Sequence, residues 1–465
     1  EAAVEAALAL LAIDPLQEDV HRKLMRLYAV QGRIGSAARQ YQACRRLLAD
    51  ELGVEPEQET QHLHAVLMRR IGQDGRERVH PDRIAWPARP PVAVRPFDVA
   101  EGADGLRDFG ERLVDGIAVN LGRGREFDVS SSAETARSTL DGKIRSRGGS
   151  VWIAISVIET ESRRQLWAKC FEQDMADLFA GHDGLARTVV SHAEAALRCA
   201  EQDRARRKRP EALDARDLFQ RGMWHLYRFT RQDSATARRM FQDAIVKAPD
   251  FALPYAGLAL NGYAEVTYGD ADNAEQLLEE AVGFGETAVY LDEEDAFGHF
   301  ALGRARTLLG RIDLAVPHLE KAIELNPGFG YAHYGLGFAH YWTGRCDRTV
   351  GHVERSIALS PRNPMLWSFH MVAASAHYQC GRYGLAEECA RAAVRARAGE
   401  YWNHLVLSVA LLSQNQRTEA RAAAAEARRL KPGLSLTLVE NSLPHLDARC
   451  LERYVNDMHA VGIPG

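Results

Sequence analysis

The chain has 465 residues, which is enough for more than one domain, and its 46% hydrophobic and 26% charged residues are typical of an ordinary globular protein. Its 58 basic and 63 acidic residues give a net charge of −5, which argues against a protein that binds nucleic acid along its whole length. No apolar run approaches the roughly 18–20 residues that cross a bilayer and no secretory leader is visible, so we expect a cytoplasmic protein with no membrane partner.

Residues 1–72 have the spacing of amphipathic helices. Apolar side chains such as Val20 and Leu24 recur at steps of three and four residues. Gly53 and Pro56 mark the end of a helix, because glycine adopts the left-handed cap and proline cannot continue a helix. The chain begins with a glutamate rather than a methionine, inside this helical pattern, so we expect further residues upstream.

The next segments change in character. Residues 73–91 are rich in Arg, Asp, Gly and Pro and are predicted to be a linker. Residues 92–200 are predicted to form a small α/β domain, whose clearest strand is the β-branched, apolar run at 151–158. The pattern also predicts strands at 92–94 and 127–129, a hairpin partner for the clearest strand at 165–171, and helices at 109–121 and 178–197.

Residues 212–432 repeat with a period of 34. The glycines and the proline at positions 303, 310 and 327 recur 34 residues later as Gly337, Gly344 and Pro361. Small residues recur where two helices touch, and Gly and Pro recur where each helix stops, so the units at 296–361 resemble tetratricopeptide repeats. Spacing of the stop prolines predicts six units between about 218 and 432, the second with ten extra residues near 262–273. Residues 433–465 are predicted to cap the array.

Residues 1–72 resemble the bacterial transcriptional activator domain. The similarity is carried by Ile13-Asp14-Pro15-Leu16-Gln17-Glu18, His21 to Met25, Gly32-Arg33, Tyr41 and Glu51 to Pro56. In that family the domain is itself built of helix pairs and follows a winged helix-turn-helix DNA-binding domain, in regulators of the antibiotic-pathway activator type. No winged helix is present in this sequence, so the resemblance implies DNA contacts only through a missing or separate domain.

Residues 92–200 resemble an α/β module that lies between an activator-type N-terminus and a repeat array in many bacterial regulators. It also occurs in proteins labelled adenylate cyclase. The similarity is carried by Val92 to Phe97, Val114 to Ile117, Leu166-Trp167-Ala168 and Asp177-Leu178-Phe179. The stretch 131–150 is shorter than the family pattern and lacks its usual strand, which predicts a reduced sheet. The sequence therefore predicts a mainly α fold, in which tetratricopeptide-type helical repeats flank a small α/β domain.

We predict no catalytic, cofactor or metal site. A cyclase needs paired carboxylates that hold two metal ions, whereas the acidic run from Asp292 to Asp295 reads as a turn and helix cap. His333 and His340 share a helix face but have no third ligand near in sequence. The cysteines are scattered and form no CxxC pair, which predicts reduced thiols. They are Cys44, Cys170, Cys199, Cys346, Cys380, Cys389 and Cys450.

An aromatic cluster is the candidate binding site for a partner. In tetratricopeptide families the matching positions line a concave groove that receives a peptide or helix. Aromatic side chains anchor interfaces because they bury a large area and have few rotatable bonds. Packing between repeats or against the neighbouring domain is the alternative. The candidates are Phe297, Phe300, Arg304, Tyr331, Tyr334, Phe338, Tyr341 and Trp342.

These patterns favour a non-enzymatic regulator. We expect the regulatory, protein-binding part of a bacterial transcription regulator, with RNA polymerase or a second copy of the chain as partner. A free-standing scaffold outside transcription is the first alternative, and a protein associated with a nucleotide cyclase is the second.

Overall fold

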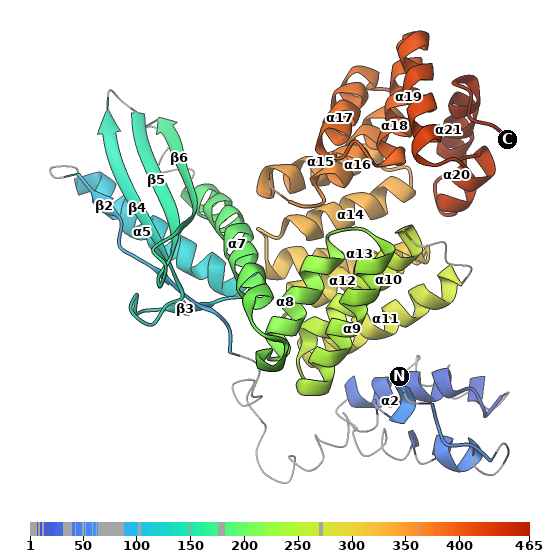
Figure 1. Ribbon diagram of the computed structural model, residues 1–465, viewed down its shortest axis with the longest axis horizontal. Coiled ribbons are helices and arrows are strands. Elements are labelled where there is room, and N and C mark those ends of the chain that lie inside the picture. Colours follow the sequence, from blue (N-terminus) through green and yellow to red (C-terminus); the bar gives the residue numbers. More distant parts are fainter. Residues whose placement is uncertain are drawn as a thin grey trace. The chain divides into compact units, whose positions relative to one another are not determined.

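The computed structural model describes residues 88–100, 104–147, 150–174, 182–268, 273–361 and 363–465. Before them it describes residues 7, 10–11, 14–30, 40–41, 43–48, 51, 53–57, 59–61 and 63. The chain divides into two compact units, Glu1–Pro87 with Ala248–Asp250, and Ala88–Lys247 with Phe251–Gly465 (Figure 1). Most of the predicted linker at 73–91 and of the predicted helix at 57–71 lies outside the described residues.

The first unit is centred on helix α2, Glu18–Val30, as its apolar spacing predicted. Leu24 and Met25 are fully buried on one face. The Glu18 carboxylate, at the start of the helix, accepts hydrogen bonds from the Glu57 backbone N–H at 3.0 Å and from the Thr60 hydroxyl at 2.7 Å. Gly53 has φ of +70°, so the predicted left-handed stop is confirmed.

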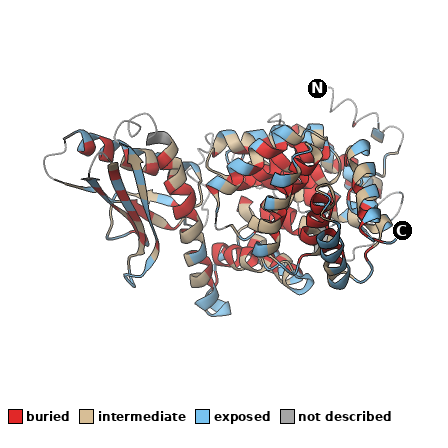
Figure 2. Cartoon of the chain, turned by 90° about the horizontal axis from the view of Figure 1, so that it is seen from above, coloured by how far each residue is buried: buried red, intermediate tan, exposed pale blue. Residues whose placement is uncertain are grey.

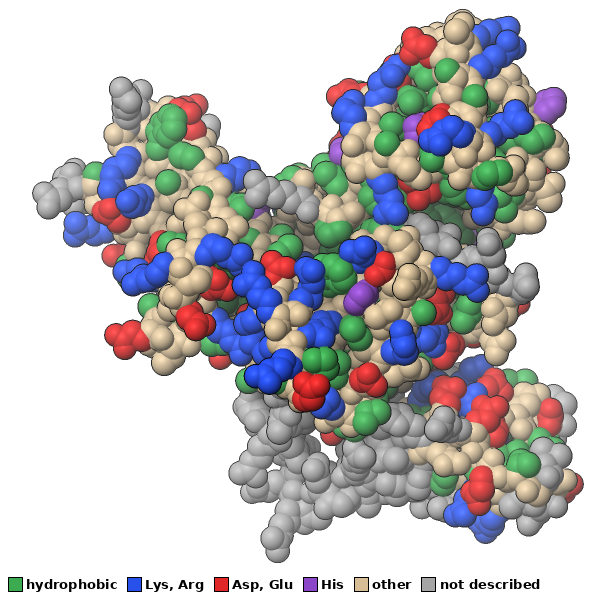
Figure 3. Space-filling view, in the orientation of Figure 1, with side chains coloured by type: hydrophobic (Ala, Val, Ile, Leu, Met, Phe, Trp, Pro, Cys, Tyr) green, Lys and Arg blue, Asp and Glu red, His purple; other side chains and the backbone are tan. Residues whose placement is uncertain are grey.

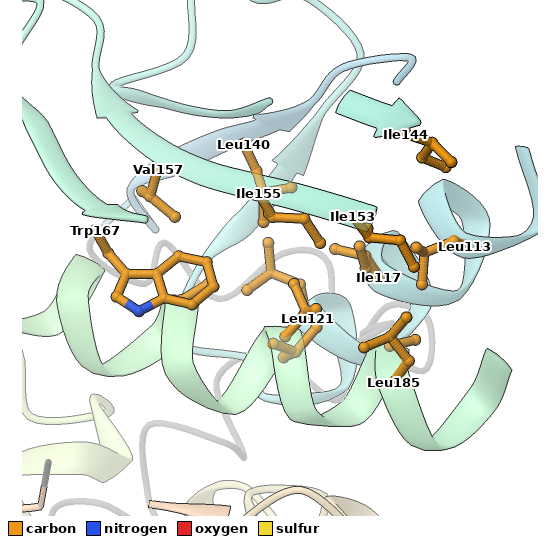
Figure 4. Close-up of a cluster of buried hydrophobic side chains, with 14 of the residues drawn as sticks. Leu113, Ile117, Leu121, Leu140, Ile144, Ile153, Ile155, Val157, Trp167 and Leu185 are labelled. Carbon is orange, nitrogen blue, oxygen red and sulfur yellow. The ribbon is translucent and has the colours of Figure 1, made fainter. Parts of the chain in front are cut away.

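The second unit begins with a sheet of six strands in the order β3-β1-β4-β5-β6, with β2 paired to β4. Strand β5 alternates buried and exposed residues, with Val151, Ile153, Ile155 and Val157 inward, so one face is covered. Helices α5 and α7 cover that face, and Leu113, Ile117 and Leu185 fill the space beneath the strands (Figure 4). The elements are β1 Pro91–Val94, β2 Asp98–Val99, α5 Asp104–Arg123, β3 Asp128–Ser130, β4 Ser138–Arg147, β5 Ser150–Glu159, β6 Gln165–Asp174 and α7 His182–Arg207.

The expectation of a missing strand at 131–150 is wrong. Strand β4 lies there, in the middle of the sheet, paired in parallel with β1 and antiparallel with β5. Its inward residues are Leu140, Gly142 and Ile144, separated by polar residues on the uncovered face. Gly142 is required beneath Phe97, because a Cβ there would lie 2.6 Å from the ring. The predicted hairpin between β5 and β6 is confirmed.

The helical repeats follow as six helix pairs within the described residues, the predicted number. The ten extra residues of the second pair mainly lengthen its helices, which have 17 and 18 residues against 13 and 14 in the third pair. The pairs are α8 Ala215–Leu226 and α9 Arg231–Lys247, α10 Ala252–Tyr268 and α11 Ala274–Leu291, α12 Ala296–Leu308 and α13 Ile312–Leu325, α14 Gly330–Trp342 and α15 Cys346–Leu359, α16 Leu366–Gln379 and α17 Tyr383–Ala396, and α18 Tyr401–Leu412 and α19 Arg417–Leu430. Helices α20 Leu436–Ser442 and α21 Ala448–Ala460 end the chain.

Helix α7 joins the α/β domain to this array. It continues past the predicted end at 197 and ends at Arg207, within a basic run at 204–209 of which Arg204, Arg206 and Arg207 lie in the last turn of the helix. Lys and Arg side chains gather on the face around the end of α7 and the first helix pair (Figure 3). Arg204 pairs with Glu201 at 2.9 Å, so this part of the basic run stabilises the helix end.

Small residues set the spacing within each pair. A Cβ on Gly303 would lie 2.6 Å from Leu319 on the partner helix, and a Cβ on Gly337 would lie 2.7 Å from Val353. Ala315 and Ala322 are completely buried at the same contact. Small residues therefore recur every 34 positions because two helix backbones approach there too closely for a larger side chain.

Histidines cap the turns between pairs. The ring Nε2 of His299 lies 3.0 Å from the carbonyl oxygen of Glu293, and that of His404 lies 2.8 Å from the oxygen of Ala398. Because a carbonyl oxygen only accepts hydrogen bonds, Nε2–H is the donor in each contact. His21 in the first unit makes the same contact with Pro15 at 2.9 Å, again six residues back. Each of the three histidines is the fourth residue of its helix, so the same side-chain contact is present at helix starts in both units.

The expectation of reduced thiols is wrong for two cysteines. Cys346 and Cys380, 34 residues apart, form a disulfide with Cα atoms separated by 5.8 Å. One opens α15 and the other caps α16, so one repeat period brings them side by side. The other five cysteines carry free thiols. Among the described helices, none is both long and apolar enough to cross a membrane.

Acidification should destabilise the array. Burial lowers the pKa of His318 and of His333 from 6.5 to about 4, so between these values the unfolded chain binds more protons and stability falls as the pH falls. The change His333→Gln should reduce the stability lost over this pH range by about 1–3 kcal/mol. Urea unfolding followed by circular dichroism between about pH 7 and pH 4.5 measures it. His459→Gln, at an exposed position on α21, is the control, and equal pH dependence in both variants would contradict the assignment.

Reduction of the disulfide should lower stability. Closing a loop of this length is worth about 3–4 kcal/mol in the chain-entropy account. Thiol titration of the denatured, unreduced protein should find the five thiols and not seven. Cys346→Ser should lower the melting temperature without reductant and make it insensitive to reductant, whereas Cys389→Ser should leave the effect of reductant in place. Seven reactive thiols in protein purified without reductant would contradict the pairing.

Candidate functional site

The inner layer of the repeat array contains all eight predicted site residues. They lie on α12 and α14, the first helices of their pairs, and such first helices pack against one another along the array. Buried residues run through the middle of the helical array (Figure 2). Six of the eight, including Arg304 and Tyr334, are at most 5% exposed, whereas Phe297 and Phe338 are half-buried. Most of these side chains are thus occupied by contacts within the chain, and binding of a partner there stays a prediction.

The first group faces the α/β domain. The ring of Phe297 lies 6.2 Å from Phe219 on α8, and Tyr331 stacks on Tyr227 with ring centroids 5.9 Å apart. Phe300 packs edge-on against Phe329 at 5.5 Å. Phe297 and Tyr331 also line a cavity that the α/β domain closes from the other side. These aromatic side chains therefore form part of the junction between domain and array.

The second group surrounds Arg304. Its guanidinium lies 4.7 Å from the ring centre of Tyr263, 5.0 Å from that of Tyr334 and 4.5 Å from that of Phe338. The side chain is 1% exposed, and its two terminal nitrogens have no hydrogen-bond acceptor among the described residues. The negative ring faces stabilise the cation instead. Because the rings come from α10 and α14, Arg304 on α12 ties three successive pairs together.

The third group, Tyr341 and Trp342, is covered by the C-terminal segment. The ring of Trp342 lies 5.2 Å from His445, and its carbonyl accepts a hydrogen bond from the Asp447 N–H at 3.0 Å. A Cβ on Gly310 would lie 2.6 Å from the His445 ring, so the turn before α21 sits directly on the glycine turn of the third pair.

Helix α21 continues this cover over the fifth pair. The Tyr454 hydroxyl donates to the Ser375 hydroxyl at 3.1 Å, and the Tyr378 hydroxyl donates to the Asp457 carboxylate at 2.6 Å. The Arg453 guanidinium lies 4.2 Å from the centre of the Tyr378 ring. Burial raises the pKa of Tyr454 to about 12, so it stays a neutral donor. The C-terminal segment thus lies on α16 and on the end of α14, next to two of the eight predicted residues, Tyr341 and Trp342.

The sequence predicts the C-terminal cap at 433–465, which contains α21, but it does not predict this contact. Tyr454 and Met458 are four residues apart and both buried, and this spacing marks the face that packs. The partners of that face lie about 80 residues earlier in the chain, for example Tyr378, so the helix pattern alone could not identify them.

The acidic run at 292–295 has the role that its sequence predicted. The Asp295 carboxylate accepts the Gly298 N–H at 2.8 Å and caps α12. Asp292 lies 3.6 Å from Arg125 of the α/β domain. In this structure these two carboxylates hold a helix start and a domain junction, so they do not form the open pair that a two-metal site requires.

Two side-chain clusters have metal-ligand chemistry. Cys346, Asp347 and Cys380 have ligand atoms within 4.8 Å of one another, but the disulfide removes both thiolates. The ring of His352 lies 5.7 Å from His333 and 5.8 Å from His340, so the two histidines noted in the sequence do have a third neighbour. That neighbour comes from the paired helix α15. Only the first cluster meets the 4.8 Å spacing within the described part of the chain.

Comparison with known families assigns two segments. Residues 1–68 match the Bacterial transcriptional activator domain, and residues 298–329 match the Tetratricopeptide repeat. The repeat match covers α12 and α13, the pair in which the period of 34 is clearest.

Comparison with individual proteins gives weaker similarities. A protein of Rhizobium meliloti (strain 1021) named "Putative adenylate cyclase 3" is 24% identical over 247 residues, or 49% of this chain, and the chain spans only 42% of its length. The pilF protein of Pseudomonas aeruginosa is 19% identical, with a TM-score of 0.37, over 52% of this chain and 99% of its own. A tetratricopeptide repeat protein from Parabacteroides merdae is 12% identical, with a TM-score of 0.35, over 61% of this chain and 95% of its own.

The two family matches bear out the combination that the sequence predicted. The chain carries a bacterial transcriptional activator domain and tetratricopeptide-type repeats, which indicates a transcription-regulator-like or protein-interaction role.

Proposed function

We propose that the chain is the regulatory, protein-binding part of a bacterial transcription regulator and has no catalytic activity of its own. The observation that carries this proposal is the match of residues 1–68 to the activator domain, in one chain with a repeat array. RNA polymerase or a second copy of the chain is the partner, and a winged helix in another part of the protein or in another chain supplies the DNA contacts.

The inner face of the array is the surface for the partner. Repeat arrays of this kind present an extended concave face on which a peptide or helix lies. In this chain, α21 occupies the part of that face built by α14 and α16, through aromatic stacking and two hydroxyl hydrogen bonds. A partner helix with a similar aromatic and acidic face would compete with α21 for Tyr341, Trp342 and Tyr378.

Two alternatives have less support. A scaffold outside transcription would use the array in the same way but gives no role to residues 1–68. A nucleotide cyclase is suggested only by the name of the Rhizobium meliloti relative, of which this chain spans 42%. Asp292 and Asp295 are the carboxylates that the sequence offers for the metal-binding pair of a cyclase. Asp292 forms an ion pair with Arg125, and Asp295 caps helix α12.

Loosening α21 should uncover the inner face. Asp457→Ala on α21 removes the acceptor of the Tyr378 hydroxyl bond and leaves the array face itself unchanged, at a cost of about 1–2 kcal/mol. Hydrogen exchange should become faster in residues 448–460 and stay unchanged in α8 to α11. Affinity for the partner should rise. Tyr263→Phe, at the Arg304 cluster on α10, is the control and should leave exchange in α21 unchanged. Unchanged or lower partner affinity in Asp457→Ala would contradict competition between α21 and the partner.

The regulator proposal is tested with the complete polypeptide, including any upstream part. We expect it to bind RNA polymerase or promoter DNA and to change transcription of a reporter. Leu24→Ala, in the core of the first unit, should weaken that unit by about 2–5 kcal/mol and reduce transcription, while the array keeps its thermal transition. Leu278→Ala, in α11, is the matched control in the array. A complete protein that neither binds polymerase or DNA nor alters transcription would overturn the proposal.

A further inference from the structure

A cavity of ≈50 Å³ lies where the α/β domain meets the repeat array. Gly124, Glu194 and Arg198 close it from the α/β side, and α8, α12 and α14 close it from the array side. A water molecule needs about 10–15 Å³ of such space, so the cavity has room for about three to five atoms of that size. Its walls belong to different layers of the protein, and a bound group would contact both.

Two cavity residues, Glu194 on α7 and Gln220 on α8, have a buried side-chain oxygen with no hydrogen-bond donor among the described residues. Of these two, Glu194 is the one that can carry a charge. The residue is 7% exposed, and its Oε1 atom is buried with no hydrogen-bond donor among the described residues. That oxygen points at Gly124, where a Cβ would lie 2.4 Å from Oε1 and 3.5 Å from the amide nitrogen of Asn326. A buried carboxylate without a donor costs several kcal/mol unless it is protonated or meets a cation.

The two arginines that line the cavity near Glu194 already form ion pairs with other carboxylates. Arg198 lies one helix turn away from Glu194. It donates hydrogen bonds to both carboxylate oxygens of Glu126, at 2.7 and 3.1 Å. Arg125 pairs with Asp292 at 3.6 Å and with Glu294. The remaining acidic group in the wall, Asp295, is engaged as the cap of α12. With its arginines paired in this way, the cavity has an uncompensated negative charge when Glu194 is ionised.

The pKa values agree with an acid that lacks its cation. Burial, opposed by Arg198 and assisted by Glu126, raises the pKa of Glu194 to about 8. Burial and the nearby Asp292 raise the pKa of Asp295 to about 7. In the empty cavity Glu194 is therefore mostly protonated at neutral pH, and a bound cation would displace that proton. The other charged and titratable groups facing the cavity are Arg125 and Glu126 from the loop after α5, Arg198 from α7, Tyr227 after α8 and Tyr331 from α14.

The rest of the wall suits an organic cation. Aromatic rings make up much of it, and their faces attract a positive charge while their area covers an alkyl group. The rings belong to Phe219, Tyr227, Phe297, Phe329 and Tyr331. We propose that this cavity binds a small alkylammonium ion, whose charged nitrogen donates to Glu194 and whose carbon atoms pack against the aromatic rings.

Binding would connect the two domains. The ammonium group is held by α7 of the α/β domain, and the alkyl group by helices of the first, third and fourth pairs. A ligand that contacts both walls stabilises their present arrangement, by RT ln(1 + [L]/Kd) for free ligand concentration [L]. The chain would thus respond to an amine through the rigidity of its domain junction, independently of what the array binds.

Calorimetric titration of the intact chain with n-propylammonium chloride tests the proposal. We expect saturable binding that strengthens as the pH rises from about 6 to about 8, with net proton release shown by comparing buffers of different ionisation heat. n-Propanol, which has the same size without the charge, should bind at least 10-fold more weakly, and propionate should not bind. Equal binding of n-propanol, or preferred binding of propionate, would overturn the proposal.

Two variants keep the test specific. Glu194→Gln preserves the shape and should weaken n-propylammonium binding at least 10-fold and abolish proton release. Gly124→Ala places a methyl group against Glu194 and should weaken binding by filling the space. Glu400→Gln, at another buried glutamate whose pKa burial raises, should bind as the unmodified chain does. Thermal unfolding shows whether each variant is folded. No binding by a folded, unmodified chain at tens of millimolar ligand, or unchanged binding by folded Glu194→Gln, would overturn the proposal.

Discussion

The close approach of two helices within each repeat is the constraint on which the second unit depends. Gly303 and Gly337 leave no room for a Cβ against the paired helix, and the small residues opposite them, Ala315 and Thr349, are fully buried. Because this contact returns every 34 residues, each pair adopts nearly the same shape, and stacking brings equivalent positions of successive pairs together. The disulfide between Cys346 and Cys380, one period apart, is a consequence of that stacking, and so is the contact of Arg304 with aromatic rings from the pairs before and after its own.

The junction between the α/β domain and the array has a different physical character. It is rich in buried charge, with Arg198 bound to Glu126 and Arg125 bound to Asp292. Buried ion pairs add little net stability, because desolvation offsets their attraction, but breaking one leaves a costly lone charge. Such a junction holds one geometry specifically without a large apolar interface. The Oε1 atom of Glu194 has no hydrogen-bond donor among the described residues, and this is the position that a cation would occupy in the proposal above.

The inner face of the array is already used by the chain itself. The predicted groove residues divide among the α/β junction, the Arg304 cluster and the cover formed by α21. A partner on this face would therefore have to replace an internal contact. Regulation by exchange of one helix for another fits a chain that combines an activator domain with repeats. It also gives the C-terminal segment a role beyond covering the last pair.

Local spacing in the sequence was sufficient to predict the element types, the six helix pairs and the β5–β6 hairpin, because each depends on residues close together in the chain. Strand β4 could also have been predicted from Leu140, Gly142 and Ile144, which alternate with polar residues. The charged residues between them, on the outer face of the strand, make this alternation hard to recognise in the sequence. The three-way division of the aromatic residues could not be predicted. A period shows which face of a helix is turned inward, but not whether a groove, a neighbouring domain or the chain's own terminus covers that face.

The sequence by itself determined the helix-pair architecture, since glycine, proline and alanine act through local sterics at fixed intervals. The similarity of the first residues to an activator domain indicated a transcription-regulator-like or protein-interaction role. Only the tertiary structure decided that Cys346 meets Cys380, that α21 lies on Tyr378, and that Glu194 faces a cavity with no hydrogen-bond donor for its Oε1 atom among the described residues. The first two contacts join residues 34 and 79 positions apart in the sequence, so they depend on how successive helix pairs stack.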